Sequence, residues 1–417
     1  MELQKGSFKS VLNAAVIVAA LGYFVDVYDL VLFLVIGVQS ILDIGVPAES
    51  KIKEFQFLLN TQMIGMLVGG LVWGILGDKK GRLSVLFGSI LVYSIANIAN
   101  GFVIELAHLF GTEVTFMYAL LRFIAGFGLA GELGAGITLV SEVVSKENRG
   151  YGTMIVASVG VTGAVVAALV GKSLGWQVAY FVGGGLGLSL LLLRIGVFES
   201  GMFEKIHQNN VSKGNFFALF KNPKIAFKYI NCILIGLPVW FVIGLLIGRA
   251  PEYAVLLGVK GIIDREYCIL FCYTGLIFGD IASGTISQLL KSRIKVFYIF
   301  YAFCAIVIWF YLSVHGLSTA VFYLFIGILG FSVGFWAMFV TVASEQFGTN
   351  LRATTTTTVP NFVRGSLVPV SMLYEYINER SGMIQAGYIV TAVTLVVAVF
   401  SLYNLQDTFG KDLDYVE

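Results

Sequence analysis

Long apolar segments, separated by short polar turns, follow one another along almost the whole chain of 417 residues. Each is close to the ~20 residues that an α-helix needs to cross the hydrocarbon core of a bilayer. Twelve such windows are expected, at 11–38, 55–77, 83–104, 115–140, 151–172, 176–197, 228–248, 267–290, 296–314, 317–343, 354–377 and 383–405. The pattern therefore predicts an all-α membrane protein of twelve transmembrane helices.

The longest polar interruption, residues 199–227, divides these windows into six and six. We expect residues 1–198 to form an N-terminal six-helix bundle and residues 199–227 to form a cytoplasmic linker. Residues 228–417 would then form a C-terminal bundle that ends in a short cytoplasmic tail. The first window is longer than the apolar core of a cleavable signal peptide, so we expect it to remain as the first span.

Lysine and arginine are distributed unevenly between the predicted loops, which sets the expected orientation. If both termini are cytoplasmic, the cytoplasmic segments carry most of the basic residues. The stretch GGLVWGILGDKKGRLSV, residues 69–85, then joins spans two and three on the cytoplasmic face. We expect a multi-pass protein of the bacterial inner (plasma) membrane.

The two halves carry a repeated motif where an even span meets the cytoplasm. SEVVSKENRG at 141–150 and SEQFGTNLRA at 344–353 both read Ser-Glu, six residues, Arg. The motif pairs Glu142 with Arg149 and Glu345 with Arg352. It indicates a duplicated six-helix unit, and repeated halves around a central site are typical of alternating-access transporters.

Composition narrows the possible functions further. The chain is 58% hydrophobic and only 12% charged, with mean hydropathy +0.87, whereas soluble domains average about 25% charged residues. A net charge of +2 gives no reason to expect nucleic acid as a partner. The sequence has no Walker A loop, GxGxxG loop, nucleophile elbow or His-Cys cluster, so we expect no enzyme activity, cofactor or metal. The four cysteines have no paired spacing and are interpreted as core residues.

The loop between spans two and three resembles the signature of the major facilitator superfamily. That signature reads G-x-x-x-D-x-x-G-R followed by Arg or Lys. The segment GILGDKKGRL supplies Gly74, Asp78, Gly81 and Arg82, with Leu83 in place of the last basic residue. The resemblance covers essentially the whole chain and implies two pseudo-symmetric six-helix bundles.

Within the superfamily, the chain is most similar to the metabolite:proton symporter and sugar porter groups. GYFVDVYDLVLF resembles the symporters' E-W-Y-D-F pattern, and RFIAGFGLAGELGAGITLVSE resembles their R-x-x-x-G-x-x-x-G-G-E pattern. The matching residues are Asp26, Tyr28, Asp29, Arg122, Gly126, Gly131 and Glu132. Ala130 replaces one glycine, and FESGMF after span six lacks the proline of the related E-S-P-x-F element.

Charges at the cytoplasmic face are candidates for a gate. Asp78 is placed to accept hydrogen bonds from the start of a neighbouring helix, and Arg82 can reach a carboxylate such as Glu142. Together with Gly81 and the pairs Glu142–Arg149 and Glu345–Arg352, they would favour the state in which the cytoplasmic side is closed. The alternative is that these charges only set the topology.

Charged residues inside the spans are candidates for proton coupling, because each is costly unless paired or hydrated. Asp29 in span one and Arg122 in span four lie at matching depths. Sugar porters that couple to protons resemble this arrangement. Separation of the pair would let Asp29 take a proton, and reunion would expel it; a static structural pair is the alternative. Asp26 lies on the same side of span one and is a further candidate for this role; the alternative is that it only faces polar neighbours.

Glu132 and Arg194 are the remaining charges within the spans of the first half. Glu132 is a second candidate proton site; alternatively it bonds to nearby backbone at a glycine-rich contact. Arg194 lies near the inner end of span six, and we expect it to extend toward the lipid headgroups.

The second half offers candidates for substrate binding. Asp280 and Arg364 fall near the middle of spans eight and eleven, where they would neutralise each other or receive a charged substrate. Further candidate contacts are Asn361, Trp240, Trp336 and Tyr28, although aromatic residues in such a chain often only pack. The threonine run at 354–358 is interpreted as structural.

Three functions fit the sequence. The favoured one is a proton-coupled importer of a small polar metabolite, acting in the lipid bilayer as a monomer. A proton-antiport exporter of drugs or siderophores is the second. It is less favoured because SVGVTGAVVAALVGKSLGW has no proline where drug antiporters carry G-P-x-x-G-G. The third is a transporter-like sensor, which would not need charges at a gate.

Overall fold

The computed structural model describes residues 14–80, 82–134, 136–137, 149–199 and 216–410. Within these ranges some residues are described by their backbone alone, at 14–15, 78–80, 82–83, 149–151, 153–154, 196–199, 218, 349–350 and 352–353. The described elements are all helices. This confirms the predicted all-α membrane fold.

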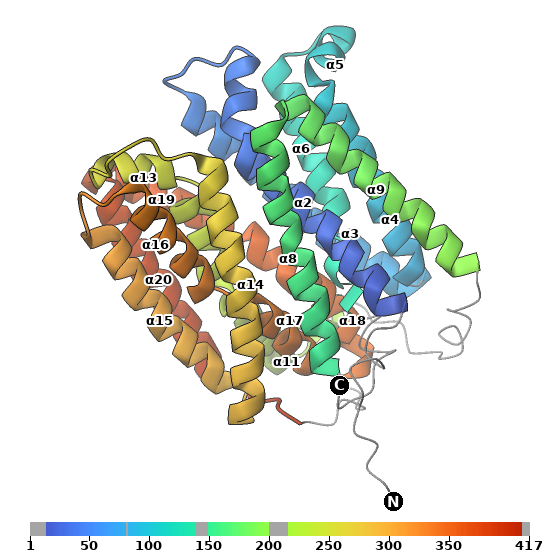
Figure 1. The fold of residues 1–417 in the computed structure, drawn as a ribbon. Coiled ribbons are helices and arrows are strands. Elements are labelled where there is room, and N and C mark those ends of the chain that lie inside the picture. Colours follow the sequence, from blue (N-terminus) through green and yellow to red (C-terminus); the bar gives the residue numbers. More distant parts are fainter. Residues whose placement is uncertain (1–13, 81, 135, 138–148, 200–215, 411–417) are drawn as a thin grey trace, which may run out of the picture.

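The helices fall into two groups along the chain (Figure 1). The N-half, residues 14–199, contains α2 (Ala14–Asp43), α3 (Lys51–Lys80), α4 (Arg82–Gly101), α5 (Val103–Phe110), α6 (Val114–Leu129), α8 (Arg149–Ser173) and α9 (Trp176–Glu199). The C-half, residues 216–410, begins with α10 (Ala218–Lys221), α11 (Pro223–Leu234), α12 (Leu237–Phe241), the π-helix η2 (Val242–Ile247), α13 (Ala250–Leu256) and α14 (Arg265–Leu290). It continues with α15 (Ile294–Ser313), α16 (Thr319–Ser332), α17 (Trp336–Glu345), α18 (Thr349–Gly365), α19 (Leu367–Ser381) and α20 (Met383–Tyr403).

Eleven of the described helical segments are long and apolar enough to span a membrane. The remaining predicted window, 354–377, corresponds to α18 and α19. The helix is interrupted at Ser366, so its two parts have only 17 and 15 residues. Five threonines and Arg364 also lower its hydropathy. The structure is thus consistent with twelve spanning helices.

Two other spans of the C-half are interrupted near the middle of the molecule. Span seven consists of α11, α12 and η2, with a turn at Gly236 followed by Pro238. Span ten consists of α16 and α17, and residues 333–335 between them are not helical. Because a break frees backbone N–H and C=O groups inside the membrane, nearby polar side chains must bond to them.

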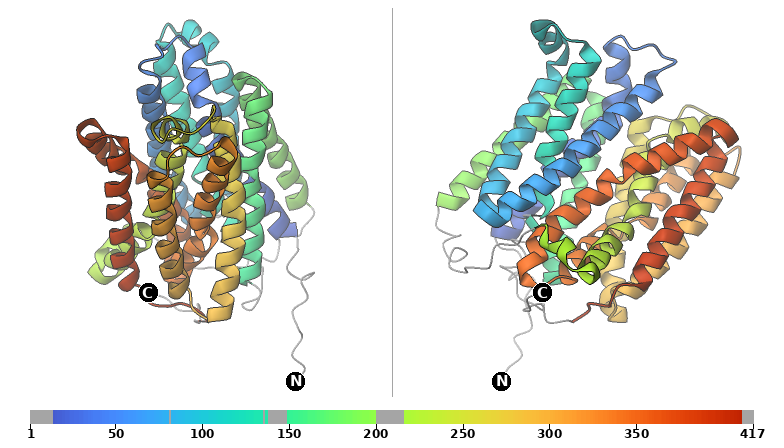
Figure 2. Two further views of the ribbon diagram at one scale, coloured as in Figure 1. Left: turned by 60° about the vertical axis from the view of Figure 1, so that its left-hand side comes forward. Right: turned by 180° about the vertical axis from the view of Figure 1, so that it is seen from behind.

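The two halves lie side by side, and the described ends of the chain lie at the same end of the bundle (Figure 2). Across the boundary, α3 packs against α18 and α8 against α14. The first long helix of the C-half starts at Pro223, inside the segment expected to be the linker. Residues 200–215 of that segment lie outside the described residues, and the proposed bundle boundaries stay a prediction.

Glycines allow corresponding helices in each half to touch. A Cβ at Gly126 of α6 would collide with the backbone carbonyl of Gln62 on α3. In the C-half, a Cβ at Gly330 of α16 would collide with the carbonyl of Cys272 on α14. These two contacts bring helix backbones together within each half, as small residues do in membrane bundles.

The predicted orientation can be tested with cysteines at two exposed positions, Ser84 and Ala48. A membrane-impermeant maleimide should label Ala48→Cys in intact cells and Ser84→Cys only after permeabilisation. The four native cysteines are buried, so they should contribute little background. Labelling of both positions from outside would contradict the orientation.

Candidate functional site

Arg122 of α6 is held by two asparagines of α4. Its Nε donates to Asn100 Oδ1 and its Nη2 to Asn97 Oδ1, each at 3.0 Å. The guanidinium also lies over the Tyr180 ring, 4.6 Å from the centroid. Asn97 and Asn100 are three positions apart, so they lie on one face of α4. The arginine is therefore fixed by neutral acceptors and stacking.

Asp29 of α2 does not form the expected ion pair with Arg122. Neither carboxylate oxygen has a hydrogen-bond partner in the described part of the chain, and the side chain is only 1% exposed. Arg122 acts on this carboxylate through its charge alone, and the Asn97 amide is close enough to interact with it, although their geometry falls short of a well-formed hydrogen bond. An unpaired ionised carboxylate is very costly to bury, so this geometry fits the protonated form of Asp29.

Asp26 of α2 pairs instead with Arg364 of α18, across the two halves. Arg364 Nη2 lies 3.5 Å from Asp26 Oδ2, and its Nη1 lies 3.4 Å from Asn361 Oδ1. The guanidinium carbon is 5.7 Å from the centroid of the Trp336 ring. Asp26 and Arg364 are 0% and 1% exposed, so this is a buried charge pair at the junction of the halves.

Asp280 does not pair with Arg364, which was one of the two arrangements expected from the sequence. Its Oδ1 accepts a hydrogen bond from the backbone N–H of Ala337 at 3.0 Å. The carboxylate therefore caps α17 where span ten resumes after its break. A helix N-terminus stabilises an anion there, and the break could not be located from the apolar pattern.

Two further hydrogen bonds join the halves near this charge pair. The Trp336 indole N–H donates to the hydroxyl of Tyr23 at 2.8 Å. The Asn361 amide donates to the carbonyl of Ala130 at 2.8 Å, where α6 has just ended. In the N-half, Tyr23 lies one helical turn before Asp26, and Ala130 lies just after the end of α6. The two halves therefore meet through polar contacts near the centre of the molecule.

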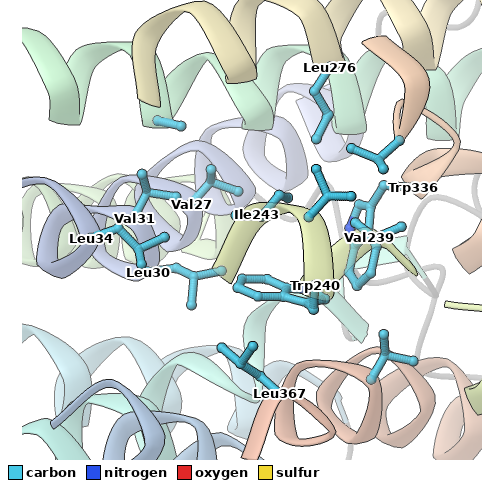
Figure 3. Packing of buried hydrophobic residues seen from close by; sticks show 14 of the residues in the cluster. Val27, Leu30, Val31, Leu34, Val239, Trp240, Ile243, Leu276, Trp336 and Leu367 are labelled. Carbon is cyan, nitrogen blue, oxygen red and sulfur yellow. The ribbon is translucent and has the colours of Figure 1, made fainter. Parts of the chain in front are cut away.

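Trp336 also packs into an apolar cluster built from both halves (Figure 3). Trp240 of α12 meets it at 6.5 Å between ring centroids with an interplanar angle of 76°. The Trp240 indole N–H has no hydrogen-bond partner within the described ranges. Tyr28, in contrast, points toward α9, and its hydroxyl donates to the carbonyl of Ala179 at 3.0 Å. Its hydroxyl is therefore bonded within the N-half in this structure.

Glu132 and Arg194 form a buried ion pair between the end of the fourth span and α9. Arg194 bonds to both carboxylate oxygens, with Nη1 to Oε2 at 3.1 Å. Arg194 is only 5% exposed, so the prediction that it extends toward the headgroups was wrong. Its face of α9 is turned inward. A Cβ at Gly22 of α2 would collide with both side chains, so α2 covers the pair closely.

Of the predicted gate residues, Glu345 is described with its side chain. It accepts hydrogen bonds from Arg293 through both oxygens, each at 3.3 Å, and from the Thr408 hydroxyl at 2.7 Å. Arg293 belongs to the turn before span nine. Gly81 and Glu142 lie outside the described residues, as do the side chains of the other gate residues, Asp78, Arg82, Arg149 and Arg352.

Asp407 ties the same face of the C-half to the segment after α20. It accepts hydrogen bonds from the Ser292 hydroxyl and from the backbone N–H of Arg293 at 3.0 Å and of Phe409 at 3.1 Å. Burial alone would raise the pKa of this carboxyl, but these hydrogen bonds outweigh it and the pKa is lowered. The network around Glu345 therefore includes a carboxylate that stays ionised to a more acidic pH than an ordinary aspartate does.

Sequence reasoning missed Asn97, Asn100 and Tyr23. Asparagine at a spacing of three inside an apolar window, as in IANIANG at 95–101, is a usable signal because a buried amide needs partners. Tyr23 gave no such signal, because tyrosines are common in this chain.

Comparison with known proteins agrees with this architecture. A family model described as Major Facilitator Superfamily matches residues 15–366. A Bacillus subtilis protein named for niacin/nicotinamide transport is 28% identical over 362 residues, covering 83% of this chain and 84% of that protein. The sialic acid transporter of Escherichia coli is 25% identical over 385 residues, covering 89% of each chain.

Solved structures share the fold. A double-tryptophan mutant of XylE superposes with a TM-score of 0.75 at 16% identity, covering 96% of this chain and 97% of that chain. The inward-open xylose transporter XylE from Escherichia coli gives a TM-score of 0.69 with the same coverage and identity. From the family match over most of its length, and from this fold, the chain belongs to the Major Facilitator Superfamily.

Proposed function

We propose that this protein is a proton-coupled importer of a small polar metabolite, such as an organic acid, amino acid, betaine or sugar, working by alternating access. At family level it is a multi-pass membrane transporter. Three relatives that cover most of the chain are named for niacin/nicotinamide, for 4-methylmuconolactone and for sialic acid, and shorter matches are named for proline and betaine. We expect it to act as a monomer in the inner membrane, with both termini in the cytoplasm.

The observation that carries the proposal is the buried, unpartnered carboxylate of Asp29 beside an arginine held by asparagines. If Arg122 leaves Asn97 and Asn100 and moves to Asp29, the carboxylate gains a cation and releases its proton. The reverse movement reloads it. Asn97 and Asn100 thus act as positioning residues, because they supply the alternative acceptors for Arg122.

Movement of the halves supplies the link to transport. The pair Asp26–Arg364 and the hydrogen bond from Trp336 to Tyr23 exist only while the halves are in contact at the centre. Opening toward either side therefore has to replace these bonds by bonds to substrate or water. A substrate that bonds to the groups freed in this way lowers the free energy needed for reorientation. Its binding is thereby coupled to the change of state.

We also propose that the cytoplasmic charges form a gate: Asp78, Gly81, Arg82, Glu142 and Arg149 in the N-half, and Glu345 and Arg352 in the C-half. The pair Arg293–Glu345 supports this, because it ties the ends of two spans together at that face. Asp78→Asn or Arg82→Ala should lower transport and shift the protein toward the inward-open state, measured by cysteine accessibility. Lys79→Ala is the matched control, since it removes a charge from the same turn. An equal loss with Lys79→Ala would mean that the charges only set topology.

The proposed function is tested by uptake into proteoliposomes. The purified protein is reconstituted with an inward proton gradient, and organic acids, amino acids, betaines and sugars are screened for accumulation. At least one class should be concentrated, and a protonophore should abolish the accumulation. Uptake that only equilibrates each compound, with or without the gradient, would overturn proton coupling.

A further inference from the structure

We infer that the substrate is a small, flat monocarboxylate whose carboxylate binds Arg364 in place of Asp26 while its flat body packs against Trp336 and Trp240. The inference rests on the proposed function, because it assigns a substrate class to the same central site. It is carried by the bonding of Arg364, by the position of Asp26 and by the apolar surroundings.

Arg364 has more donors than acceptors in this structure. Its contacts to Asp26 and Asn361 measure 3.5 and 3.4 Å, longer than usual for N–H···O bonds. Its Nε has no partner in the described part of the molecule. A guanidinium that is 1% exposed and so weakly bonded is well placed to bind another carboxylate, which can accept two parallel N–H bonds.

Displacing Asp26 from Arg364 makes the proton obligatory. Asp26 Oδ1 already lacks a partner among the residues that the structure describes. Without Arg364, the whole carboxylate would be an unpaired buried anion, so it must take a proton. Asp29, one helical turn away on α2, is the group that loads and releases this proton. One substrate anion and one proton then enter the cluster together, and its total charge stays unchanged. A substrate without net charge adds no anion to the cluster, so its binding does not require this proton.

The surroundings of Arg364 favour a flat apolar body over a polyol. The two indole rings stand nearly perpendicular, and one side of them packs against the aliphatic side chains drawn in Figure 3, while Tyr23, Arg364 and Asp280 lie on the polar side. The aliphatic side chains come from both halves: Val27, Leu30, Val31, Leu34, Val239, Ile243, Leu276 and Leu367. A sugar would leave most of its hydroxyls without partners against such a surface. These tryptophans are at most 5% exposed, so substrate enters when the halves separate.

A cationic or zwitterionic substrate fits less well. Its positive group would have to share the Trp336 face with the Arg364 guanidinium. Asp280, the remaining carboxylate near Trp336, already caps the start of α17 through Ala337. A cation would therefore be repelled by Arg364. The charge of the Asp280 carboxylate is already partly compensated by the start of α17, so it would attract the cation only weakly.

Three molecules with one ring skeleton separate these possibilities: nicotinate is an anion, nicotinamide is neutral and N-methylnicotinate is a zwitterion. Binding to the purified protein is followed by quenching of tryptophan fluorescence at acidic and neutral pH, with benzoate as a second flat anion and xylose as a polyol. Nicotinate and benzoate should bind at least ~10-fold more tightly than the other three. Their affinity should increase at acidic pH, because binding takes up a proton.

Variants assign the effect to Arg364. Arg364→Lys keeps the charge but loses the planar set of donors, so it should weaken nicotinate binding by ~10-fold or more. Arg249→Lys is the matched control: Arg249 is also buried, pairs with Glu375 and lies 5.3 Å from the Tyr374 ring centroid, away from the centre. It should leave binding unchanged. Asp26→Asn should remove the pH dependence of nicotinate binding.

Equal binding of nicotinamide and nicotinate, or an Arg364→Lys variant that binds normally, would overturn the substrate assignment. Binding of neither anion would overturn it as well. Nicotinate binding without uptake driven by the proton gradient would leave the substrate class standing and overturn proton coupling. Proton-driven accumulation of sugars or betaines alone would leave proton coupling standing and overturn the substrate class.

Discussion

Replacing Asp29 with asparagine should abolish the accumulation of substrate driven by a pH gradient. Asparagine imitates the protonated carboxylate, whose oxygens have no partner in the described residues, and it cannot release a proton. The buried site accepts a neutral side chain, so the fold and the exchange of substrate across the membrane should survive at least in part. The measurement compares gradient-driven uptake with counterflow exchange in proteoliposomes.

Asp43→Asn is the control for this experiment, because Asp43 lies at the end of α2 and accepts from the Trp176 indole. It should leave uptake and exchange unchanged. If Asp29→Asn loses binding, exchange and uptake together, Asp29 is a structural partner or a substrate ligand. If the variant still concentrates substrate, coupling lies elsewhere, and Asp26 becomes the leading candidate because it pairs across the halves.

Arg194→Leu should destabilise the folded protein strongly, by about 3–5 kcal/mol, because it leaves Glu132 as an unpaired buried charge. The double variant Glu132→Gln/Arg194→Leu should recover much of that loss, since no charge is then left alone. The purified protein is heated, and its thermal unfolding is measured as the loss of protein from the monodisperse peak in size-exclusion chromatography.

Transport by Glu132→Gln distinguishes the two roles considered for this residue. If the ion pair only holds α2, α6 and α9 together, the variant should be less stable but still accumulate substrate with the proton gradient. Stable protein with lost coupling would instead make Glu132 a proton site. Gly22→Ala should destabilise the protein less than Arg194→Leu, because its methyl group meets the flexible ends of the two side chains and leaves both charges in place.

The spans could be predicted from the sequence because the length of apolar segments is fixed by the bilayer. The buried positions of Asp29, Arg122, Asp280 and Arg364 follow from the same windows. Their partners could not be predicted in this way. Depth along a helix does not say which face a side chain occupies, and that face decided both the pairing of Arg194 and the hydrogen bonds of Arg122 to α4.

The apolar pattern also did not predict where the helices are interrupted. The break at residues 333–335 lies within one continuous apolar window, yet it creates the helix start that Asp280 caps. Once Asp280 is used there, Asp26 becomes the partner of Arg364. A single backbone feature thus changed the assignment of two carboxylates.

Buried charges of opposite sign are nearly balanced in the described interior of the bundle, away from its two ends. These groups are Arg122, Arg194, Arg364, Asp26, Asp29, Glu132 and Asp280. With a proton on Asp29 they sum to zero, and without it they carry one negative charge. A unit charge that crosses the membrane gains or loses about 2.3 kcal/mol per 100 mV. Voltage therefore acts little on the proton-loaded protein, whereas a negative-inside potential drives the unloaded form back toward the outside.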